Sequence, residues 1–179
     1  MDSSEFRDFL SNRVSVREYY PGELSESQVE YILGCASTAP SAGNLEAWDV
    51  VIVFDDEEKT EISAAAFEQR HVEEASALFI VCANYVRSMS RYGERGILYA
   101  VQDATIACTY MMLGAHALGL HSCWVGAMDE GEVRSIAGLP SHLRPVAILC
   151  VGKGRLPGAF TPRMAAGEHV HYGTWEGVG

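Results

Sequence analysis

The sequence has very little lysine and no basic segment. Lys59 and Lys153 are its two lysines, and 24 acidic residues outnumber the 13 basic ones, which gives a formal net charge of −11. A chain without a basic stripe cannot replace the counterions of a nucleic-acid backbone, so we exclude nucleic acid as a partner. Nearly all the cations are arginines, which suit fixed, bidentate contacts to anions.

Paired cysteines are also missing. The five cysteines are odd in number and widely spaced, and no two form a C-x-x-C pair: Cys35, Cys82, Cys108, Cys123 and Cys150. This spacing predicts reduced, mostly buried thiols and a cytoplasmic protein, rather than zinc ligands or disulfides. The N-terminal segment is acidic and amphipathic, so we expect no signal peptide. His169 and His171 could share a metal ion, but two ligands are too few for a metal site, so we expect none.

One stretch lacks charge altogether. The 25 residues from Ala104 to Met128 contain no Asp, Glu, Lys or Arg, which is long enough to span a bilayer. However, the stretch is bracketed by Asp103 and Asp129 rather than by basic residues, and Gly119 interrupts it. We therefore predict a buried helix followed by a short strand, and no membrane association. Asp103 itself is expected to satisfy local backbone or partner groups.

Helical and strand patterns alternate along the chain. Ser3 or Ser4 is expected to cap a first helix that ends at Asn12, and Ser25 with Gln28 forms a capping box. The expected helices are 3–12, 25–37, 55–67, 97–118 and 129–138, and the expected strands are 48–54, 77–85, 121–125 and 145–152. The polar connection 87–96 is predicted to be mobile. We expect one domain over 1–179, with 153–179 as an extended C-terminal arm and a sheet covered by helices.

Two arginines and a hydroxyl follow the first helix. In an extended segment alternate residues point the same way, so Arg13, Ser15 and Arg17 would share one face. Such a face could hold a phosphate or an electron-rich ring carbonyl, because charge-assisted hydrogen bonds are the stronger ones. The alternative is a pair of surface arginines matched with Glu18 or Glu23.

A short polar loop precedes the first strand. Pro40, Ser41 and Asn44 offer a hydroxyl, an amide and exposed backbone N–H groups. Taken alone, the same residues suit an ordinary helix-to-strand turn.

The order of these pieces carries more information than any one of them. "RVSVREY", "APSAGNLEAWDVVIV" and the stretch from "YGERGILYAVQDA" to "PVAILCVG" resemble the FMN-dependent nitroreductase family over about residues 6–175. The resemblance implies an α+β fold, a three-layer α/β/α sandwich with a central, mostly antiparallel sheet. It also implies a homodimer whose long helix and C-terminal arm pack across the interface.

The resemblance also implies cofactor-binding residues. The R-x-S-x-R segment would hold the FMN phosphate and the pyrimidine side of the ring, with Arg163 also at the phosphate. The P-S-x-x-N loop would reach the flavin of the partner subunit, and the backbone of a W-x-G-A segment would lie near flavin N5. The residues implied are Arg13, Ser15, Arg17, Pro40, Ser41, Ala42, Asn44, Val125, Gly126, Ala127 and Arg163.

Several positions depart from the family pattern. Glu46 and Ala47 stand where Gln-Pro is usual, which places a carboxylate next to the loop. On the approach to the second strand, Gln69 or His71 could take the place of the usual Asn or Lys, and Gln69 is our choice. Lys153 and Arg155 compete with Arg163 for the phosphate.

The function implied is reduction of small acceptors, such as nitroaromatics or quinones, by NADH or NADPH in a ping-pong mechanism on FMN. Because the cofactor would supply the redox chemistry, no catalytic side chain is needed. Two alternatives remain: a specialised flavin enzyme (a dehalogenase, a flavin-fragmenting enzyme or an enoyl-type reductase), and a flavin-binding dimer without turnover.

Overall fold

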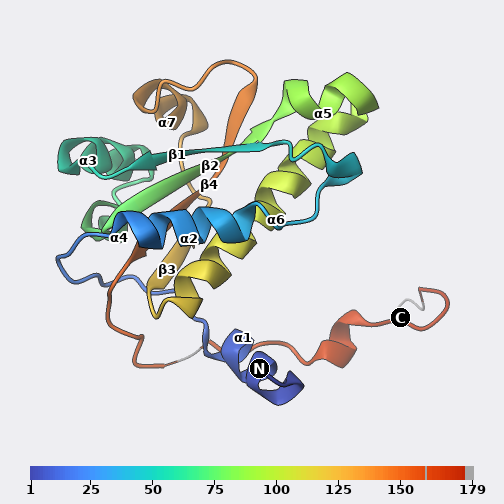
Figure 1. Cartoon of the computed structure of the whole chain (residues 1–179), viewed down its shortest axis with the longest axis horizontal. Helices are drawn as coiled ribbons and strands as arrows, with labels where there is room; N and C mark the ends of the chain where they lie inside the picture. The colour runs from blue at the N-terminus through green and yellow to red at the C-terminus, as the bar shows by residue number, and fades with distance from the viewer. Residues whose placement is uncertain (160, 176–179) are drawn as a thin grey trace.

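A four-stranded sheet forms the centre of the molecule (Figure 1). The computed structural model describes residues 1–159 and 161–175. The strand order is β1 (Trp48–Val53), β2 (Ala77–Asn84), β4 (Leu143–Gly152) and β3 (His121–Val125), and each neighbouring pair is antiparallel. The predicted antiparallel character of the sheet is confirmed.

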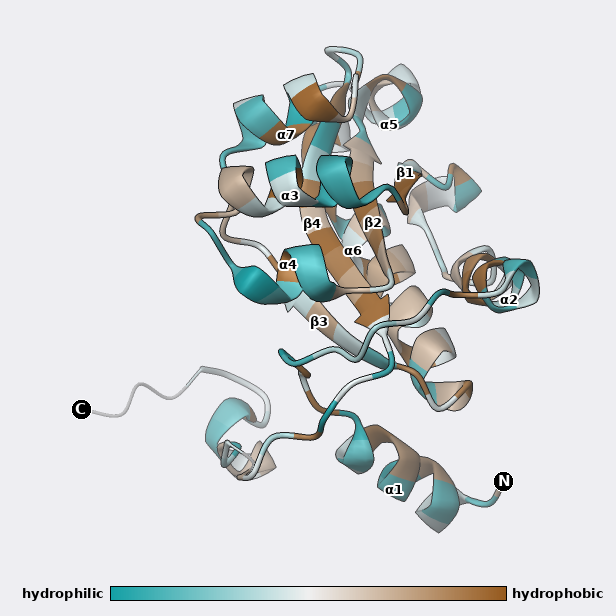
Figure 2. Cartoon of the chain, turned by 90° about the vertical axis from the view of Figure 1, so that its left-hand side faces the viewer, coloured by the Kyte–Doolittle hydropathy of each residue, from teal (hydrophilic) through white to brown (hydrophobic). Residues whose placement is uncertain are grey.

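Helices cover both faces of this sheet. One face carries α3 (Asp56–Ala65), α4 (Arg70–Glu74) and α7 (Glu130–Ile136), whereas α2 (Glu26–Ala36) and α6 (Arg95–Ala117) lie on the other face (Figure 2). The α+β, three-layer arrangement that the resemblance implied is therefore confirmed.

Strand β2 shows why two cores form. All of its residues are buried, and successive side chains point to opposite faces. Leu78, Ile80 and Cys82 pack under α3, α4 and α7. Phe79 and Val81 pack under α2 and α6. Because both faces of β2 are buried, its sequence is almost entirely apolar instead of alternating between apolar and polar residues.

One predicted helix cap and one predicted helix end were wrong. The first helix, α1 (Ser3–Asn12), is capped by Asp2, whose carboxylate accepts the N–H groups of Ser4 and Glu5, rather than by a serine. The helix expected over 55–67 ends at Ala65. The short helix α4 then follows, and at five residues it is too brief to leave a helical period in the sequence.

The prediction of a mobile connection over 87–96 was also wrong. Helix α5 (Tyr85–Tyr92) occupies most of it, and α6 begins at Arg95 instead of residue 97. The side chain of Asn84 caps α5 by accepting the N–H of Arg87 at 3.0 Å. Gly93 ends the helix with a positive φ of 54°, a conformation that glycine adopts at little cost.

Within the described residues, no helix combines the length and apolarity needed to cross a bilayer. After β4, the described part of the chain forms one further element, the short 3₁₀ helix η2 (Ala166–His169). The arm predicted over 153–179 includes residues 160 and 176–179, which lie outside the described residues.

Candidate functional site

The segment after α1 lies in parallel beside the edge strand β3. Ser15 bridges Ser122, and the backbone N–H of Val16 donates to the carbonyl of Ser122 at 3.0 Å. Val16 is fully buried and Val14 packs against the same core. Because residues alternate in an extended segment, Arg13, Ser15 and Arg17 are left on the other face, as predicted.

The parallel register orders these side chains along β3. Arg13 precedes Ser15 by two residues, so it lies level with Leu120, directly before the strand begins at His121. Two residues after Ser15, Arg17 is level with Trp124. The segment thus offers a cation near each end of β3, with a hydroxyl between them.

Arg13 lies near a second arginine rather than near a carboxylate. Burial lowers the pKa of its guanidinium, and the positive charge of Arg163 lowers this pKa further. A partly buried arginine that also experiences a second positive charge is suited to hold an anion. Arg163, which the resemblance placed at a phosphate, is therefore close to the segment that it was expected to join.

The other two candidates for the phosphate have partners of their own. Arg155 forms an ion pair with Glu18 at 2.7 Å, and Lys153 donates from Nζ to the carbonyl of Gly119 at 2.8 Å. Arg155 still borders the pocket next to Arg17, which has a volume of about 440 Å³ and is lined by Ser15, Arg17, Glu18, Arg155, Leu156, Pro157 and Gly158.

The far end of β3 meets the turn before α4. Gln69 donates from Nε2 to the carbonyls of Ala66 at 2.7 Å and Ala127 at 3.0 Å. It thereby holds the backbone that follows Val125 and Gly126 against this turn. Both amide hydrogens are engaged in these contacts, so only its Oε1 remains free for a ligand.

His71, the alternative to Gln69, is buried beside this turn. Burial lowers the pKa of its imidazole, and the charge of Arg17 lowers it further. Its Nε2 is buried without a hydrogen-bond partner. His71 therefore lies close to Arg17, but this nitrogen is not exposed to a ligand.

The predicted polar loop is held by a buried aspartate of α6. Asp103 accepts the backbone N–H of Ala42 on one carboxylate oxygen at 2.9 Å and that of Ala47 on the other at 3.1 Å. The loop contains η1 (Ala42–Asn44), and the hydroxyl of Ser41 accepts the N–H of Glu46. The expectation that Asp103 satisfies local backbone groups is confirmed.

Arginines of α5 hold the loop from its other side. Arg87 donates to the carbonyls of Glu46 and Trp48 and pairs with Asp49 at 3.1 Å, and Arg91 donates to the carbonyl of Gly43. Sequence reasoning missed this role because it treated 87–96 as mobile. Asn84 directly after a buried strand, with Gly93 nine residues later, was the available signal for a capped helix.

The structure does not bring this loop to the arginine segment of the same chain. Asp103 contacts the loop, whereas Nε2 of His116 donates to the carbonyl of Phe9 in α1, at 3.0 Å. These two residues are 13 positions apart on α6, which corresponds to about 20 Å. Figure 1 likewise shows η1 on the opposite side of α6 from the segment that follows α1. Pro40, Ser41, Ala42 and Asn44 thus lie together, apart from Arg13, Ser15 and Arg17.

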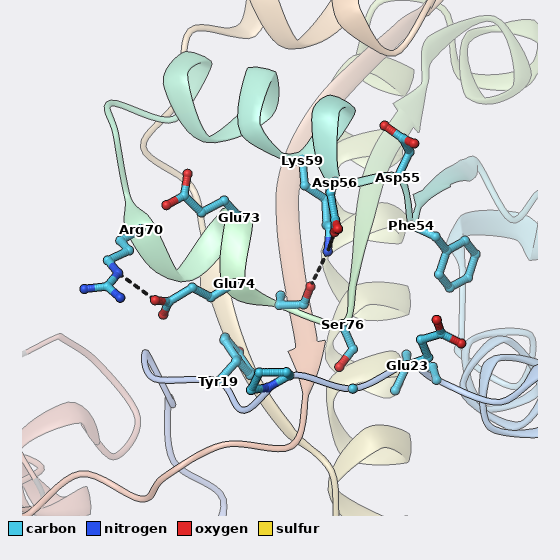
Figure 3. Close-up of a pocket in the computed structure, with 14 residues that line it drawn as sticks. Tyr19, Glu23, Phe54, Asp55, Asp56, Lys59, Arg70, Glu73, Glu74 and Ser76 are labelled. Carbon is cyan, nitrogen blue, oxygen red and sulfur yellow. Dashed lines mark hydrogen bonds and ion pairs between the residues drawn. The ribbon is translucent and has the colours of Figure 1, made fainter.

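A pocket of about 1010 Å³ lies elsewhere and is acidic (Figure 3). Its two cations are already paired, Lys59 with Asp56 at 2.8 Å and Arg70 with Glu74 at 2.6 Å. Three further carboxylates line it, those of Glu23, Asp55 and Glu73. A phosphate dianion would be repelled here, so this pocket is not the anion site.

Comparisons with known proteins agree with this arrangement. Residues 10–80 and 63–153 match the family described as the Nitroreductase family. A "Putative NADH dehydrogenase/NAD(P)H nitroreductase" of Archaeoglobus fulgidus is 31% identical over 147 residues, covering 80% of this chain and 82% of that protein. The "FMN reductase (NADPH)" of Bacillus subtilis is 24% identical over 93% of this chain and 72% of its own length.

A solved structure is similar throughout. That of B. megaterium NfrA1 superimposes with a TM-score of 0.90 at 26% identity, covering 96% of this chain and 75% of that one.

Proposed function

The chain belongs to the nitroreductase family, and from this we propose that it is an NAD(P)H-dependent flavin oxidoreductase that holds FMN along residues 13–17. One observation carries the proposal. Arg13 and Arg17 lie level with the two ends of β3, the charge of Arg163 acts on Arg13, and none of the three forms an ion pair with another described residue. In a chain with net charge −11, such a group of unpaired cations would suit an anionic ligand.

The residues present fit the parts of FMN from one end to the other. Arg13 and Arg163 suit the phosphate, with the Ser15 hydroxyl as a further donor. Arg17 suits the electron-rich pyrimidine side of the ring, because a cation there stabilises negative charge that develops on reduction. When bound, FMN supplies the two-electron chemistry that no side chain of this site could supply.

The backbone of residues 125–127 is the element that would border the reacting edge of the ring. Gln69 fixes its position through Ala127. We infer one open pocket over this edge, in which the nicotinamide donor and the acceptor bind in turn, and nitroaromatics or quinones are the acceptors proposed. Two relatives named NAD(P)H nitroreductase and FMN reductase support this choice of donor and acceptors.

The position of the polar loop supports a homodimer. The loop lies about 20 Å from the arginine segment of its own chain, so it would contribute to a flavin only across a subunit interface. Beside the loop, α6 exposes Ile97 and Leu98, which are 41% and 47% accessible, and these would be buried by a second copy. Residues 153–179 would form the arm that packs on the partner.

Sedimentation tests this assembly. We expect a dimer at micromolar concentration, and Leu98→Glu should shift it towards monomer because a carboxylate would then be buried at the interface. Glu94→Gln, one turn earlier on the surface, is the control. A folded wild-type monomer under these conditions contradicts the two-chain site.

The function itself is tested by titrating flavin-free protein with FMN and following the loss of flavin fluorescence. We expect saturable binding of one FMN per chain. Protein that leaves FMN fluorescence unchanged at all concentrations would refute the cofactor assignment.

Glu46 offers a test of the alternative that the protein is a flavin-binding dimer without turnover. Its backbone is held by Ser41 and Arg87, and its carboxylate is left exposed beside the loop. If that carboxylate faces the partner's flavin, Glu46→Gln removes a charge that opposes reduction, and the rate of flavin reduction by NADPH should rise about two- to fivefold. Stopped-flow absorbance measures this rate. An unchanged rate would remove Glu46 from the account of reduction.

All five cysteines carry free thiols, and four of them are buried. These thiols suit a reducing compartment, and we place the protein in the cytoplasm on that basis.

A further inference from the structure

A small pocket adjoins the arginine segment at the beginning of β3. Its volume is about 200 Å³, and it shares Leu156 with the larger pocket beside Ser15 and Arg17. The end of α1, the C-terminal part of α6 and the first residues of β3 form its walls. The lining residues are Asn12, Arg13, Val14, His116, Leu120, His121, Ser122 and Leu156.

The charged and titratable groups of this pocket are all basic. Arg13, His116 and His121 line it, and no Asp or Glu does. Burial lowers the pKa of His121, and the charges of Lys153 and His116 lower it further. Arg13 thus gives the pocket a positive charge that no carboxylate of the lining opposes, and this charge favours a bound anion.

The hydrogen bonds of the two histidines distinguish their roles. Nδ1 of His121 accepts the backbone N–H of Gly154 at 3.0 Å, so the neutral ring carries its proton on Nε2. That Nε2–H makes no hydrogen bond to another described residue. In His116, by contrast, Nε2 is already engaged with the carbonyl of Phe9. His121 is thus the histidine with a donor available and a fixed ring orientation.

We propose that His121 is a ligand of the FMN phosphate, donating from Nε2 beside Arg13. The assignment rests on the proposed function, and it follows from the register that places Arg13 at the beginning of β3, where His121 is the first residue. The phosphate would then lie at this end of the strand, with the ring towards residues 124–127.

Two substitutions separate the donor from the structural contact. His121→Asn keeps an acceptor for the N–H of Gly154 but removes the donor at the Nε2 position. His121→Gln retains a donor close to that position. A hydrogen bond to a charged group is the contact removed, so we expect His121→Asn to weaken FMN binding about tenfold or more and His121→Gln to weaken it less than about threefold.

Riboflavin, which lacks the phosphate, is the matched ligand. Its affinity, measured by the same fluorescence titration, should be equal in the wild type and in both variants. Equal losses for FMN and riboflavin in His121→Asn would show a structural role and overturn the assignment, as would an unchanged FMN affinity. Wild-type protein that binds neither flavin would refute the proposed function and this assignment with it.

The pH dependence gives an independent readout. With its lowered pKa, His121 is neutral at pH 7, and a phosphate beside it raises that pKa because the anion stabilises the imidazolium. Binding therefore takes up a proton as the pH falls from about 7 to 5.5. Over this range FMN affinity of the wild type should rise relative to His121→Gln, whose side chain does not titrate. Parallel profiles for the two proteins contradict the assignment.

Discussion

Arg13→Ala should weaken FMN binding by about ten- to a hundredfold, because it removes a charge-assisted contact to the phosphate. The flavin-free protein should not lose stability. Arg13 has no carboxylate partner that would be left unpaired, and the charge of Arg163 lies close to its own. The substitution thus relieves a repulsion, and its melting temperature should be unchanged or higher.

Arg155→Ala is the matched control for this result. Arg155 also borders the pocket, but it is largely exposed and is paired with Glu18. Exposed pairs contribute little, so FMN affinity should change by less than about fivefold. Full retention of FMN by Arg13→Ala, measured by fluorescence titration, would remove this residue from the site.

Asp103→Ala should destabilise the fold by about 3–5 kcal/mol and release the polar loop. Both oxygens of this carboxylate accept backbone N–H groups, and the side chain is only 2% exposed. Each hydrogen bond to a buried charged group contributes on the order of 1.5–3 kcal/mol, and its loss leaves an N–H unpaired. Urea unfolding and amide exchange at Ala42 and Ala47 measure the two effects.

Asp55→Ala provides a control with the same number of hydrogen bonds. Asp55 accepts the N–H groups of Glu57 and Glu58 at the beginning of α3, but it is exposed to water. Its removal should cost about 1 kcal/mol, as for other exposed helix caps. If both substitutions lowered the free energy of unfolding equally, burial would not be what makes Asp103 important.

Much of the fold follows from local signals in the sequence. The strands were predicted because they are largely apolar, and α2 because Ser25 and Gln28 form a capping box. The predictions failed where a polar stretch had to be divided into helices and loops. The connection 87–96 has few apolar residues, and its helical order comes from a cap at Asn84 and from contacts of Arg87 with the polar loop.

The candidate site was predictable in part for a similar reason. Alternation along an extended segment is a local property, so the shared face of Arg13, Ser15 and Arg17 could be predicted. Arg163 was named through the family resemblance, whereas the pairing of Arg155 with Glu18 and of Lys153 with Gly119 depends on the tertiary fold and could not be predicted. The proposed role of His121 could not be predicted either, because it depends on a hydrogen bond from Gly154, which is distant in the sequence.

The central claim is tested most directly by the visible spectrum of the purified protein, recorded without oxygen before and after addition of NADPH and then NADH. Our account predicts the spectrum of a bound flavin, which bleaches with at least one of the two donors and thereby identifies it. A colourless protein that takes up no added FMN and shows no bleaching would contradict it.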